Sequence, residues 1–172
     1  MKKRSERVID YSVFLNGTEY LGTATATLPE ITYLVDTIKG GGINGEMEAP
    51  APGQTGAMTL TLNWRTIEAA AAKLIAPKSH ALDLRASIQT FDPATNEYKE
   101  TAFKVTVRGR PLALSMGNLE PAATMDTNNT FSISYLKVMI DGVEALEIDK
   151  YNYVHKVYGV DYLAVTKANL GM

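Results

Sequence analysis

The chain has 172 residues, of which 45% are hydrophobic and 21% charged, and its formal net charge is −2. This composition is typical of a globular domain and excludes wholesale disorder, and the charge balance excludes the strongly basic surface of a tight duplex-binding protein. The sequence contains no cysteine, which excludes disulfides, thiolate catalysis and cysteine-ligated metals. No apolar run approaches the roughly 18–20 residues of a membrane-spanning helix.

The length predicts a single domain over residues 1–172, because a chain of 18.7 kDa can bury some 70% of its surface without staples. Residues 1–10 are interpreted as a basic N-terminal extension, since they contain Lys2, Lys3, Arg4 and Arg7. No apolar stretch follows of the kind that completes a signal peptide. We therefore expect the protein to be made in, and at first soluble in, a cytoplasm.

The first third of the chain predicts short strands. Residues 13–15 run into Asn16-Gly17, a strong hairpin signal because both central residues of the favoured turn need a positive φ. Residues 18–28 alternate in a period of two, and Pro29 marks the end or edge of a strand because it cannot donate to a ladder. Residues 31–38 are expected to resume as a strand.

Residues 39–56 lose this periodicity. They hold six of the 13 glycines, together with Pro50 and Pro52. We interpret them as an extended loop of about 18 residues, a length that is uncommon in a compact domain unless the loop is functional or disordered. A linker is the competing interpretation, but the 38 residues before it are too few for an independent core.

The middle of the chain predicts a strand, a helix and then more strands. Residues 58–64 alternate as a half-buried strand. Residues 66–75 are Ala-rich and are expected to form a helix, with Thr66 as its N-cap and Pro77 as its stop. Strands are then expected over 82–89, 97–108, around 119–125, 131–138 and 143–149, with turns at 92–96, 126–129 and Asp141-Gly142.

A short helix over 162–169 is expected to end the chain, capped by Asp161 and closed by Gly171. Because most strands are joined by tight turns, the predicted fold is mainly β. It is an antiparallel β-sandwich or barrel with one mid-chain α-helix, a short C-terminal helix and a long Gly/Pro-rich loop.

The sequence shows no motif of a known catalytic or metal site. His80 and His155 are isolated, so each is more easily explained as a structural or surface residue than as a ligand or base. Glu46 and Glu48 could serve in acid–base chemistry, but a solvated charged face explains them better. Trp64 is expected to be a core anchor. We expect no catalytic residue, no cofactor and no metal.

Several strands carry one wholly polar face of mostly short side chains. In a monomer such a face is simply a solvent-exposed face of the sheet. In an oligomer it could line an aqueous channel, because the unpaired edges of sheets can pair with strands of neighbouring subunits to form a larger wall. The composition does not decide between the two. The faces are Thr23/Thr25/Thr27, Thr59/Thr61/Asn63, Asp83/Arg85/Ser87/Gln89 and Ser132/Ser134.

A series of segments in a fixed order carries a resemblance that extends from Phe14 to Gly171. The segments are Leu28-Pro29, the Gly-Gly-Gly-Ile-Asn-Gly-Glu run at 40–46, residues 60–64 with the Ala-rich helix behind them, 82–86, 134–137, 147–150, 159–163 and Leu170-Gly171. In their order and spacing they resemble the major tail tube proteins of contractile-tailed bacteriophages.

The resemblance implies a β-barrel or sandwich flanked by a helix. It implies hexameric rings whose inner sheets join into one barrel, and rings that stack into a hollow tube for DNA inside a contractile sheath. The implied partners are other copies of the chain, the sheath, baseplate and terminator proteins, and DNA passing without sequence-specific binding; no membrane is implied. The implied location is a virion tail assembled in the host bacterial cytoplasm, although the same fold serves phage-tail-like bacteriocins.

The tube role also predicts where subunits meet. The Gly/Pro loop over 39–56 can lie along a neighbouring subunit, because its glycines allow a close backbone approach. The expected interface residues are Lys39, Gly40, Gly41, Gly42, Ile43, Asn44, Gly45, Glu46, Met47 and Glu48 in this loop, and Asp161, Tyr162 and Leu163 near the C-terminal helix.

Two other functions are weighed against the tube subunit. One is a small β-sandwich binding module that presents the loop over 39–56 to a carbohydrate or protein. The other is an enzyme that uses Glu46, Glu48 or a histidine as a base, and this is the least favoured.

Overall fold

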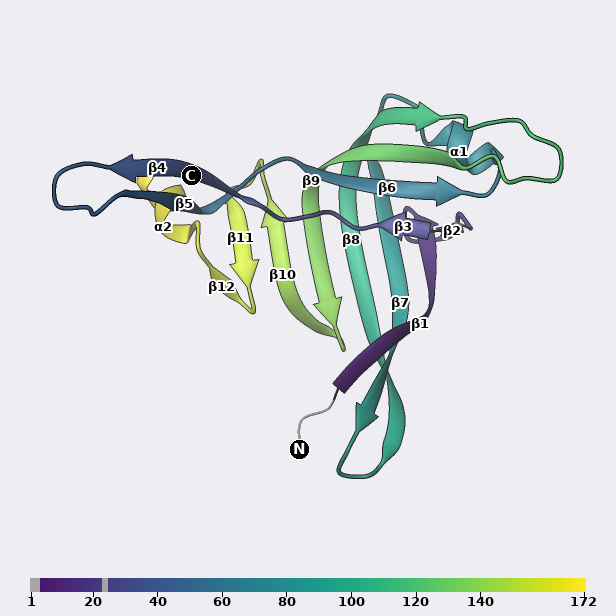
Figure 1. Cartoon of the computed structure of the whole chain (residues 1–172), viewed down its shortest axis with the longest axis horizontal. Coiled ribbons are helices and arrows are strands. Elements are labelled where there is room, and N and C mark those ends of the chain that lie inside the picture. Colours follow the sequence, from purple (N-terminus) through teal and green to yellow (C-terminus); the bar gives the residue numbers. More distant parts are fainter. Residues whose placement is uncertain (1–3, 23–24) are drawn as a thin grey trace.

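A computed structural model describes residues 4–22 and 25–172, and within them it contains twelve strands and two short helices (Figure 1). The strands are β1 (Arg4–Leu15), β2 (Glu19–Tyr20), β3 (Thr25–Thr27), β4 (Tyr33–Lys39), β5 (Glu46–Thr55), β6 (Met58–Trp64), β7 (His80–Asp92), β8 (Glu97–Ser115), β9 (Thr127–Ile140), β10 (Val143–Asp149), β11 (Val154–Val157) and β12 (Val160–Asp161); the helices are α1 (Ala69–Lys73) and α2 (Ala164–Asn169).

The strands form a two-layered antiparallel structure, which confirms the predicted mainly-β fold class. One layer has the order β12-β11-β10-β9-β8-β7-β1-β2. The other is built on β6, which pairs with β3 on one side and with the first half of β9 on the other. Strands β4 and β5 pair with each other in a separate two-stranded sheet.

Two long strands, β8 and β9, pass from one layer into the other. The second half of β9 pairs with β10, and its first half pairs with β6. The register of β8 against β9 shifts between Arg108 and Gly109 and again between Pro111 and Ala113. Such irregularities bend a strand and increase its twist, so they allow one continuous β8–β9 ladder to serve both layers.

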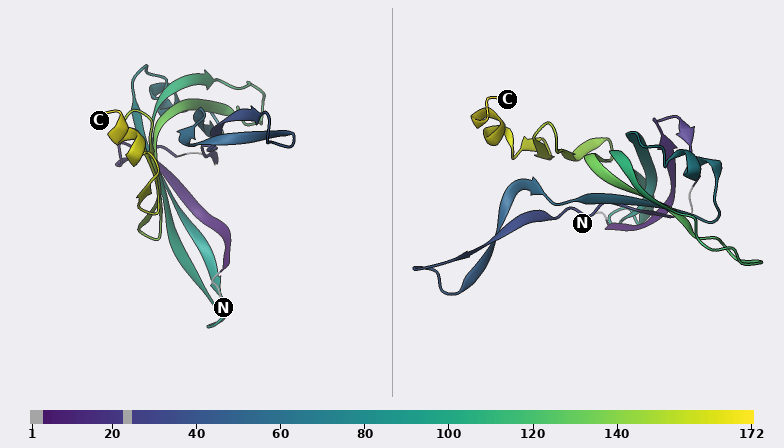
Figure 2. Two further views of the ribbon diagram at one scale, coloured as in Figure 1. Left: turned by 90° about the vertical axis from the view of Figure 1, so that its left-hand side faces the viewer. Right: turned by 90° about the horizontal axis from the view of Figure 1, so that it is seen from above.

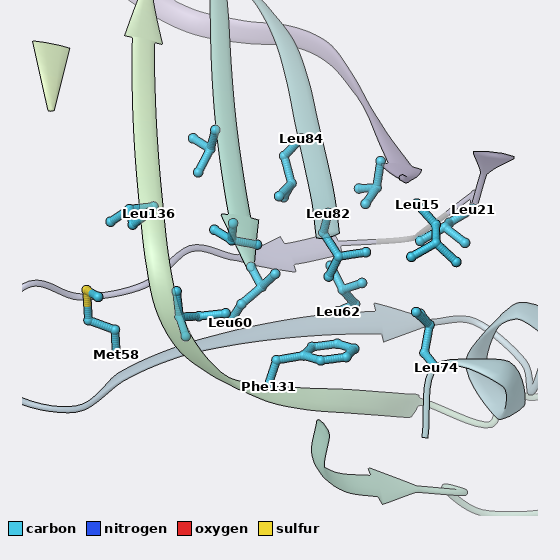
Figure 3. Close-up of a cluster of buried hydrophobic side chains, with 14 of the residues drawn as sticks. Leu15, Leu21, Met58, Leu60, Leu62, Leu74, Leu82, Leu84, Phe131 and Leu136 are labelled. Carbon is cyan, nitrogen blue, oxygen red and sulfur yellow. The ribbon is translucent and has the colours of Figure 1, made fainter. Parts of the chain in front are cut away.

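The hydrophobic core fills the space between the two layers (Figure 3). Alternation within the strands supplies it, because successive side chains point to opposite faces. In β6, Met58, Leu60, Leu62 and Trp64 are all buried and the residues between them are more exposed. They meet core side chains that include Val13, Leu15, Leu82, Leu84, Val105, Val107, Phe131 and Leu136.

Trp64 is fully buried, as expected of a core anchor, and its polar atom is paired. Its indole Nε1 donates to Asn129 Oδ1 at 2.8 Å, and Asn129 Nδ2 donates to the Ala71 carbonyl at 3.1 Å. The side chain of Asn129 therefore ties β6, β9 and α1 together inside the core.

Both predicted hairpin turns are confirmed, the first as the three-residue connection 16–18 and the second as the two residues Asp141 and Gly142. Asn16 and Gly17, between β1 and β2, have φ of 53° and 78°, and Asp141 and Gly142, between β9 and β10, have φ of 52° and 77°. These left-handed conformations suit Asn, Asp and Gly, and they match the twist of the flanking strands.

The expected loop over 39–56 is wrong for most of its length. Glu46–Thr55 is strand β5, and residues 46–50 and Thr55 pair with β4. Its prolines and glycine are accommodated because the pairing is irregular between Tyr33 and Val35, where residues 51–54 bulge away from the ladder. The loop itself is confined to 40–45.

The interpretation of residues 1–10 as an extension also needs correction, because Arg4 to Asp10 belong to β1. They pair with β7 as far as Arg4 opposite Phe91. The β7–β8 hairpin projects beyond the core, which gives this part of β1 a strand to pair with (Figure 1).

Both helices are shorter than predicted. Helix α1 covers Ala69–Lys73 after Glu68, and Thr66 does not cap it. Isolated helices of this length are unstable, so burial of Ala71 and Leu74 holds the turn rather than alanine propensity. Helix α2 begins at Ala164; Gly171 ends it with a φ of 71°, as expected.

Three predictions about short segments need correction: the strand over 119–125, the turn over 126–129 and the strand over 18–28. Residues 119–125 form no strand, since Pro121 lacks a backbone N–H. The turn expected over 126–129 reduces to Asp126, with β9 starting at Thr127. The strand expected over 18–28 is divided into β2 and β3, and Thr23 lies outside the described residues.

Candidate functional site: a projecting hairpin arm and its base

The β4–β5 hairpin projects from the two-layered body as an arm (Figure 2). All seven residues of β4 are exposed, and the strand spans about 23 Å at roughly 3.3 Å per residue. The accessible surface of the chain, 11005 Å², exceeds the ~8,000 Å² expected of a compact protein of this mass. The chain thus exposes more surface than a compact monomer does.

The arm exposes a group of large apolar side chains. Their exposed fractions range from 41% at Ile43 to 56% at Val35. Because successive residues of a strand point to opposite faces, Tyr33 and Val35 lie on one face of the hairpin, and Leu34, Ile38 and Met47 lie on the other. A two-stranded hairpin is marginal by itself in water, so large apolar side chains exposed on both of its faces indicate a contact site. The group, called here the arm apolar surface, consists of Tyr33, Leu34, Val35, Ile38, Ile43 and Met47.

The predicted interface residues Lys39 to Glu48 lie together at the tip of this arm. Lys39 and Glu46 face each other across the hairpin at 3.6 Å, and both are largely exposed, so the pair adds little stability. Gly42 and Gly45 have φ of 88° and 99°, which lets the chain reverse between the two strands. Glu48 is exposed opposite Thr37.

The other predicted interface residues, Asp161 to Leu163, lie at the opposite end of the arm. The Tyr33 hydroxyl is 3.1 Å from His155 Nε2, and Tyr162 lines a concavity with Tyr33 and Gly53. The structure therefore brings the C-terminal residues to the base of the arm, far along the hairpin from its tip.

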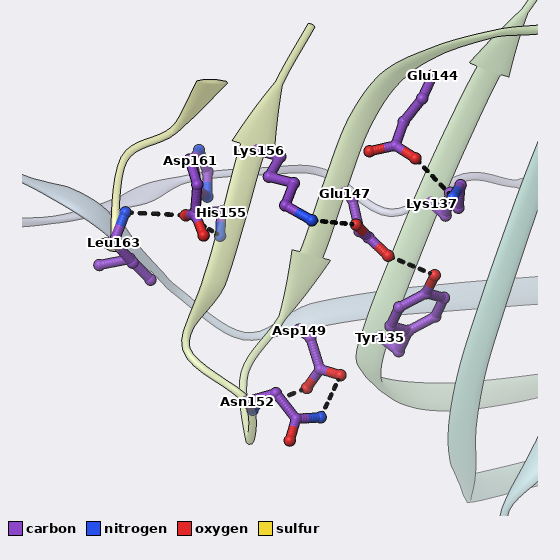
Figure 4. A network of polar contacts seen from close by, with 10 residues as sticks. All are labelled: Tyr135, Lys137, Glu144, Glu147, Asp149, Asn152, His155, Lys156, Asp161 and Leu163. Carbon is purple, nitrogen blue, oxygen red and sulfur yellow. Dashed lines mark hydrogen bonds and ion pairs between the residues drawn. The ribbon is translucent and has the colours of Figure 1, made fainter. Parts of the chain in front are cut away.

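Asp161 organises the C-terminal segment. Its Oδ1 accepts hydrogen bonds from the backbone N–H of His155 at 3.2 Å and of Leu163 at 3.0 Å (Figure 4). The carboxylate thus fixes Leu163 where its side chain contacts Gly53, and it acts just before α2 rather than as the expected cap of a longer helix.

Lys150 fastens the base from the β10 side. Its Nζ donates to the carbonyls of Thr55, at 3.2 Å, and Gly56. Gly56 N–H in turn donates to the Thr32 carbonyl at 2.8 Å, which closes the arm where it leaves the body. Sequence reasoning missed Tyr33, Lys150 and Gly53 as anchors, because their partners are about 95 or more residues away in the chain.

His155 is buried, 2% exposed, so of the two interpretations, structural or surface, the surface one is wrong. Burial lowers its pKa, and the neighbouring Asp161 carboxylate offsets this in part. Its Nδ1 has no hydrogen-bond partner within the described part of the chain. The neutral ring is therefore the form that the folded protein favours.

The stability of the folded chain is expected to depend on pH through His155. Because the pKa of His155 is lower in the folded chain than its ordinary value of about 6.5, unfolding binds a proton below that pH, and stability falls as the pH falls from 7 toward the lowered pKa. In His155→Gln the loss of unfolding free energy between pH 7 and 5, measured in urea, is expected to be smaller. An unchanged loss would contradict this role.

The contact between Gly53 and Leu163 is expected to stabilise the chain. Gly53 has a φ of 76°, and a Cβ there would lie 2.7 Å from Leu163 Cγ and Cδ2. We expect Gly53→Ala to destabilise the chain by about 1–3 kcal/mol more than Gly42→Ala, which has a similar φ but open space around it. Equal unfolding free energies for the two variants would show that the contact with Leu163 is unimportant.

A network of charged groups covers the outer face of β9, β10 and β11 (Figure 4). Glu147 accepts from the Tyr135 hydroxyl at 2.9 Å and from Lys156 at 3.3 Å, and Lys137 pairs with Glu144 at 2.5 Å. Burial alone would raise the pKa of Glu147, but these donors and Lys137 hold that pKa below its ordinary value. Glu147 is consequently held ionised and paired with Lys156.

The remaining chemistry-bearing residues are dispersed. His80 is buried and donates from Nε2 to the Ala76 carbonyl at 3.2 Å. Glu46 and Glu48 are at the arm tip, remote from both histidines. Across residues 4–22 and 25–172 no group of three or more His, Cys, Asp or Glu is placed to hold a metal ion. No helix in the same ranges is long and apolar enough to cross a membrane.

The two-layered body is similar to known tube-associated structures. The cryo-EM structure of the sheath/tube terminator of an extracellular contractile injection system, PVC, in the extended state matches with a TM-score of 0.54 at 14% identity, over 79% of this chain and 97% of that one. The PVC sheath-tube complex gives 0.47 at 12% identity, over 76% and 86% of the chains. The first likeness shows that the class of fold is shared.

The sequence of the chain also matches a known protein family. The family model of phage tail tube protein FII matches residues 5–171, so the chain belongs to that family. The tail tube protein of Escherichia phage P2 is 29% identical over an alignment of 166 residues, and the match covers 94% of this chain and 94% of that protein. The resemblance seen in the sequence is thereby confirmed: the chain is a structural subunit of a tail tube and a component of the virion tail.

Proposed function

We propose that copies of this chain, each a single domain over 1–172, close into rings, most simply hexamers, and that the rings stack into a hollow tube. The tube would conduct DNA inside a contractile sheath, without catalysis, cofactor or metal. Membership of the tail tube family supports this proposal. The sheath, the baseplate and the tail terminator would be its other partners.

The observation that carries the proposal is the β4–β5 arm. Its base is held by Tyr33, Gly53 and Lys150, whereas its length carries the arm apolar surface into solvent. A neighbouring copy of the chain is the simplest cover for that surface, because head-to-tail contacts between identical subunits close into rings or extend into filaments. Both sets of predicted interface residues belong to the arm and its base. The tip would contact the neighbouring subunit, and the C-terminal segment would fix the direction in which the arm projects.

The test is assembly of the purified protein. Electron microscopy and sedimentation over a range of protein concentrations are expected to show rings and stacked rings. Dispersed monomers at every concentration would overturn the proposal. They would favour the alternative of a small β-sandwich module that presents the arm to a carbohydrate or another protein.

A further inference from the structure

The two layers present solvent faces of different chemistry. The strands β3, β6, the first half of β9 and the end of β8 turn short polar side chains outward, in register with one another. We call this the threonine face. It consists of Thr25, Thr27, Thr59, Thr61, Asn63, Asn128, Thr130, Ser132, Arg110, Ala113 and Ser115.

The threonine face is nearly free of ionisable groups. Asn63 Nδ2 donates to Thr25 Oγ1 at 2.9 Å, and the Thr61 and Thr130 hydroxyls are 3.5 Å apart, so neighbouring strands are linked by neutral hydrogen bonds. Arg110, beside Ser132, is the one ionisable member of the set.

The outer face of the other layer is charged, and its charges are paired. Asp83 accepts from the Thr106 hydroxyl at 2.6 Å and lies 3.3 Å from Lys104 Nζ and 3.6 Å from Arg85. Burial alone would raise the pKa of Asp83, but these partners hold that pKa below its ordinary value. The network of Lys137, Glu144, Glu147 and Lys156 continues this charged face across β9–β11.

The sheet of the threonine face has two edges that can be extended. Within the described residues, β3 pairs with β6 alone, and β8 beyond Gly109 pairs with β9 alone. The strand order β3-β6-β9-β8 is antiparallel throughout. Because the number of strands is even, β8 of one copy would lie antiparallel to β3 of the next, and the ladder could continue around a ring.

We propose that the threonine face lines the lumen of the tube and that the charged face turns away from it. This inference rests on the proposed function. Passing DNA is a polyanion, so lysine and arginine along its path would hold phosphates, while a neutral surface of hydroxyls and amides stays wet without binding them. Of the two polar faces, the threonine face is the one that meets this requirement.

The absence of cysteine makes the test direct, because a single introduced cysteine is the one thiol of the chain. Thr59→Cys and Ser132→Cys place it at exposed positions of the threonine face. Lys104→Cys and Arg108→Cys place it on the charged face, where Arg108 lies beside Tyr135. Assembled tubes of each variant are treated with a small soluble maleimide or with maleimide beads far wider than any protein tube.

In tubes, thiols at 59 and 132 are expected to react with the small reagent and to be protected from the beads, whereas a thiol at 104 or 108 reacts with the beads. In dissociated subunits all four should react with both. Bead capture of tubes through position 59 or 132, or failure of the small reagent to reach them, would overturn the assignment. Absence of tubes in the parent protein overturns the proposed function instead, so the two failures are distinguishable.

Discussion

Replacing residues 37–48 by Asn-Gly is expected to abolish tube formation while leaving a folded subunit. The replacement keeps the Asp36–Ala49 pair, Tyr33 and Gly53, so the base of the arm stays intact. It removes Ile38, Ile43 and Met47 from the arm apolar surface. Because the deleted residues are exposed, the free energy of unfolding should change by less than about 1 kcal/mol. Sedimentation and electron microscopy measure assembly, and urea unfolding measures stability.

The matched control breaks an exposed ion pair on the body and leaves the arm unchanged. Lys73→Gln with Glu19→Gln removes an exposed pair at 2.8 Å between α1 and β2, which contributes little, and should assemble normally. If the variant with the shortened arm forms normal tubes, the arm is not required for assembly. Deletion of 41–55 is a poorer test, because it would also remove Gly53 and the Thr55 carbonyl that hold the base.

The second large effect is expected at Asn129. Asn129→Leu leaves the Trp64 indole N–H and the Ala71 carbonyl buried without their partner. Each orphaned group costs about 1–3 kcal/mol, so we expect a loss of about 3 kcal/mol in the free energy of unfolding. Trp64, the single tryptophan of the chain, reports the unfolding of this region by fluorescence.

Asn128→Leu is the control for Asn129→Leu. Asn128 is the neighbouring residue on the same strand, it is half-buried, and it points away from the core. A change of about 0.5 kcal/mol or less is expected there. Equal losses at the two positions would show that the hydrogen bonds of Asn129 are not what stabilises the joint between β6, β9 and α1.

Local patterns in the sequence predicted much of the fold. The alternation in 58–64 predicted β6 and its buried side, and Asn16-Gly17 and Asp141-Gly142 predicted their turns. These features depend on neighbouring residues, which a sequence displays directly. The predictions that were wrong concern segments whose structure depends on pairing with another strand. Glu46–Thr55 forms a strand because β4 lies beside it, and Arg4 to Asp10 belong to β1 because β7 extends far enough to pair with them.

The sequence predicted both segments of the candidate site, but not the contacts that hold the arm at its base. The sequence favoured both 39–48 and 161–163 as places where subunits meet, and their role in assembly remains a proposal. It did not show that Tyr33 contacts His155, that Leu163 packs on Gly53 or that Lys150 holds Thr55. These contacts join segments that carry no shared motif, so only the three-dimensional structure shows that the C-terminal segment holds the base of the arm.

A cryo-EM reconstruction of the assembled protein tests the central claim most directly. Our account predicts a hollow stack of rings in which Val35, Ile38 and Met47 of each arm are buried against a neighbouring subunit. A map in which every arm lies free in solvent, or a purified protein that stays monomeric with its arm folded onto its own body, would contradict it.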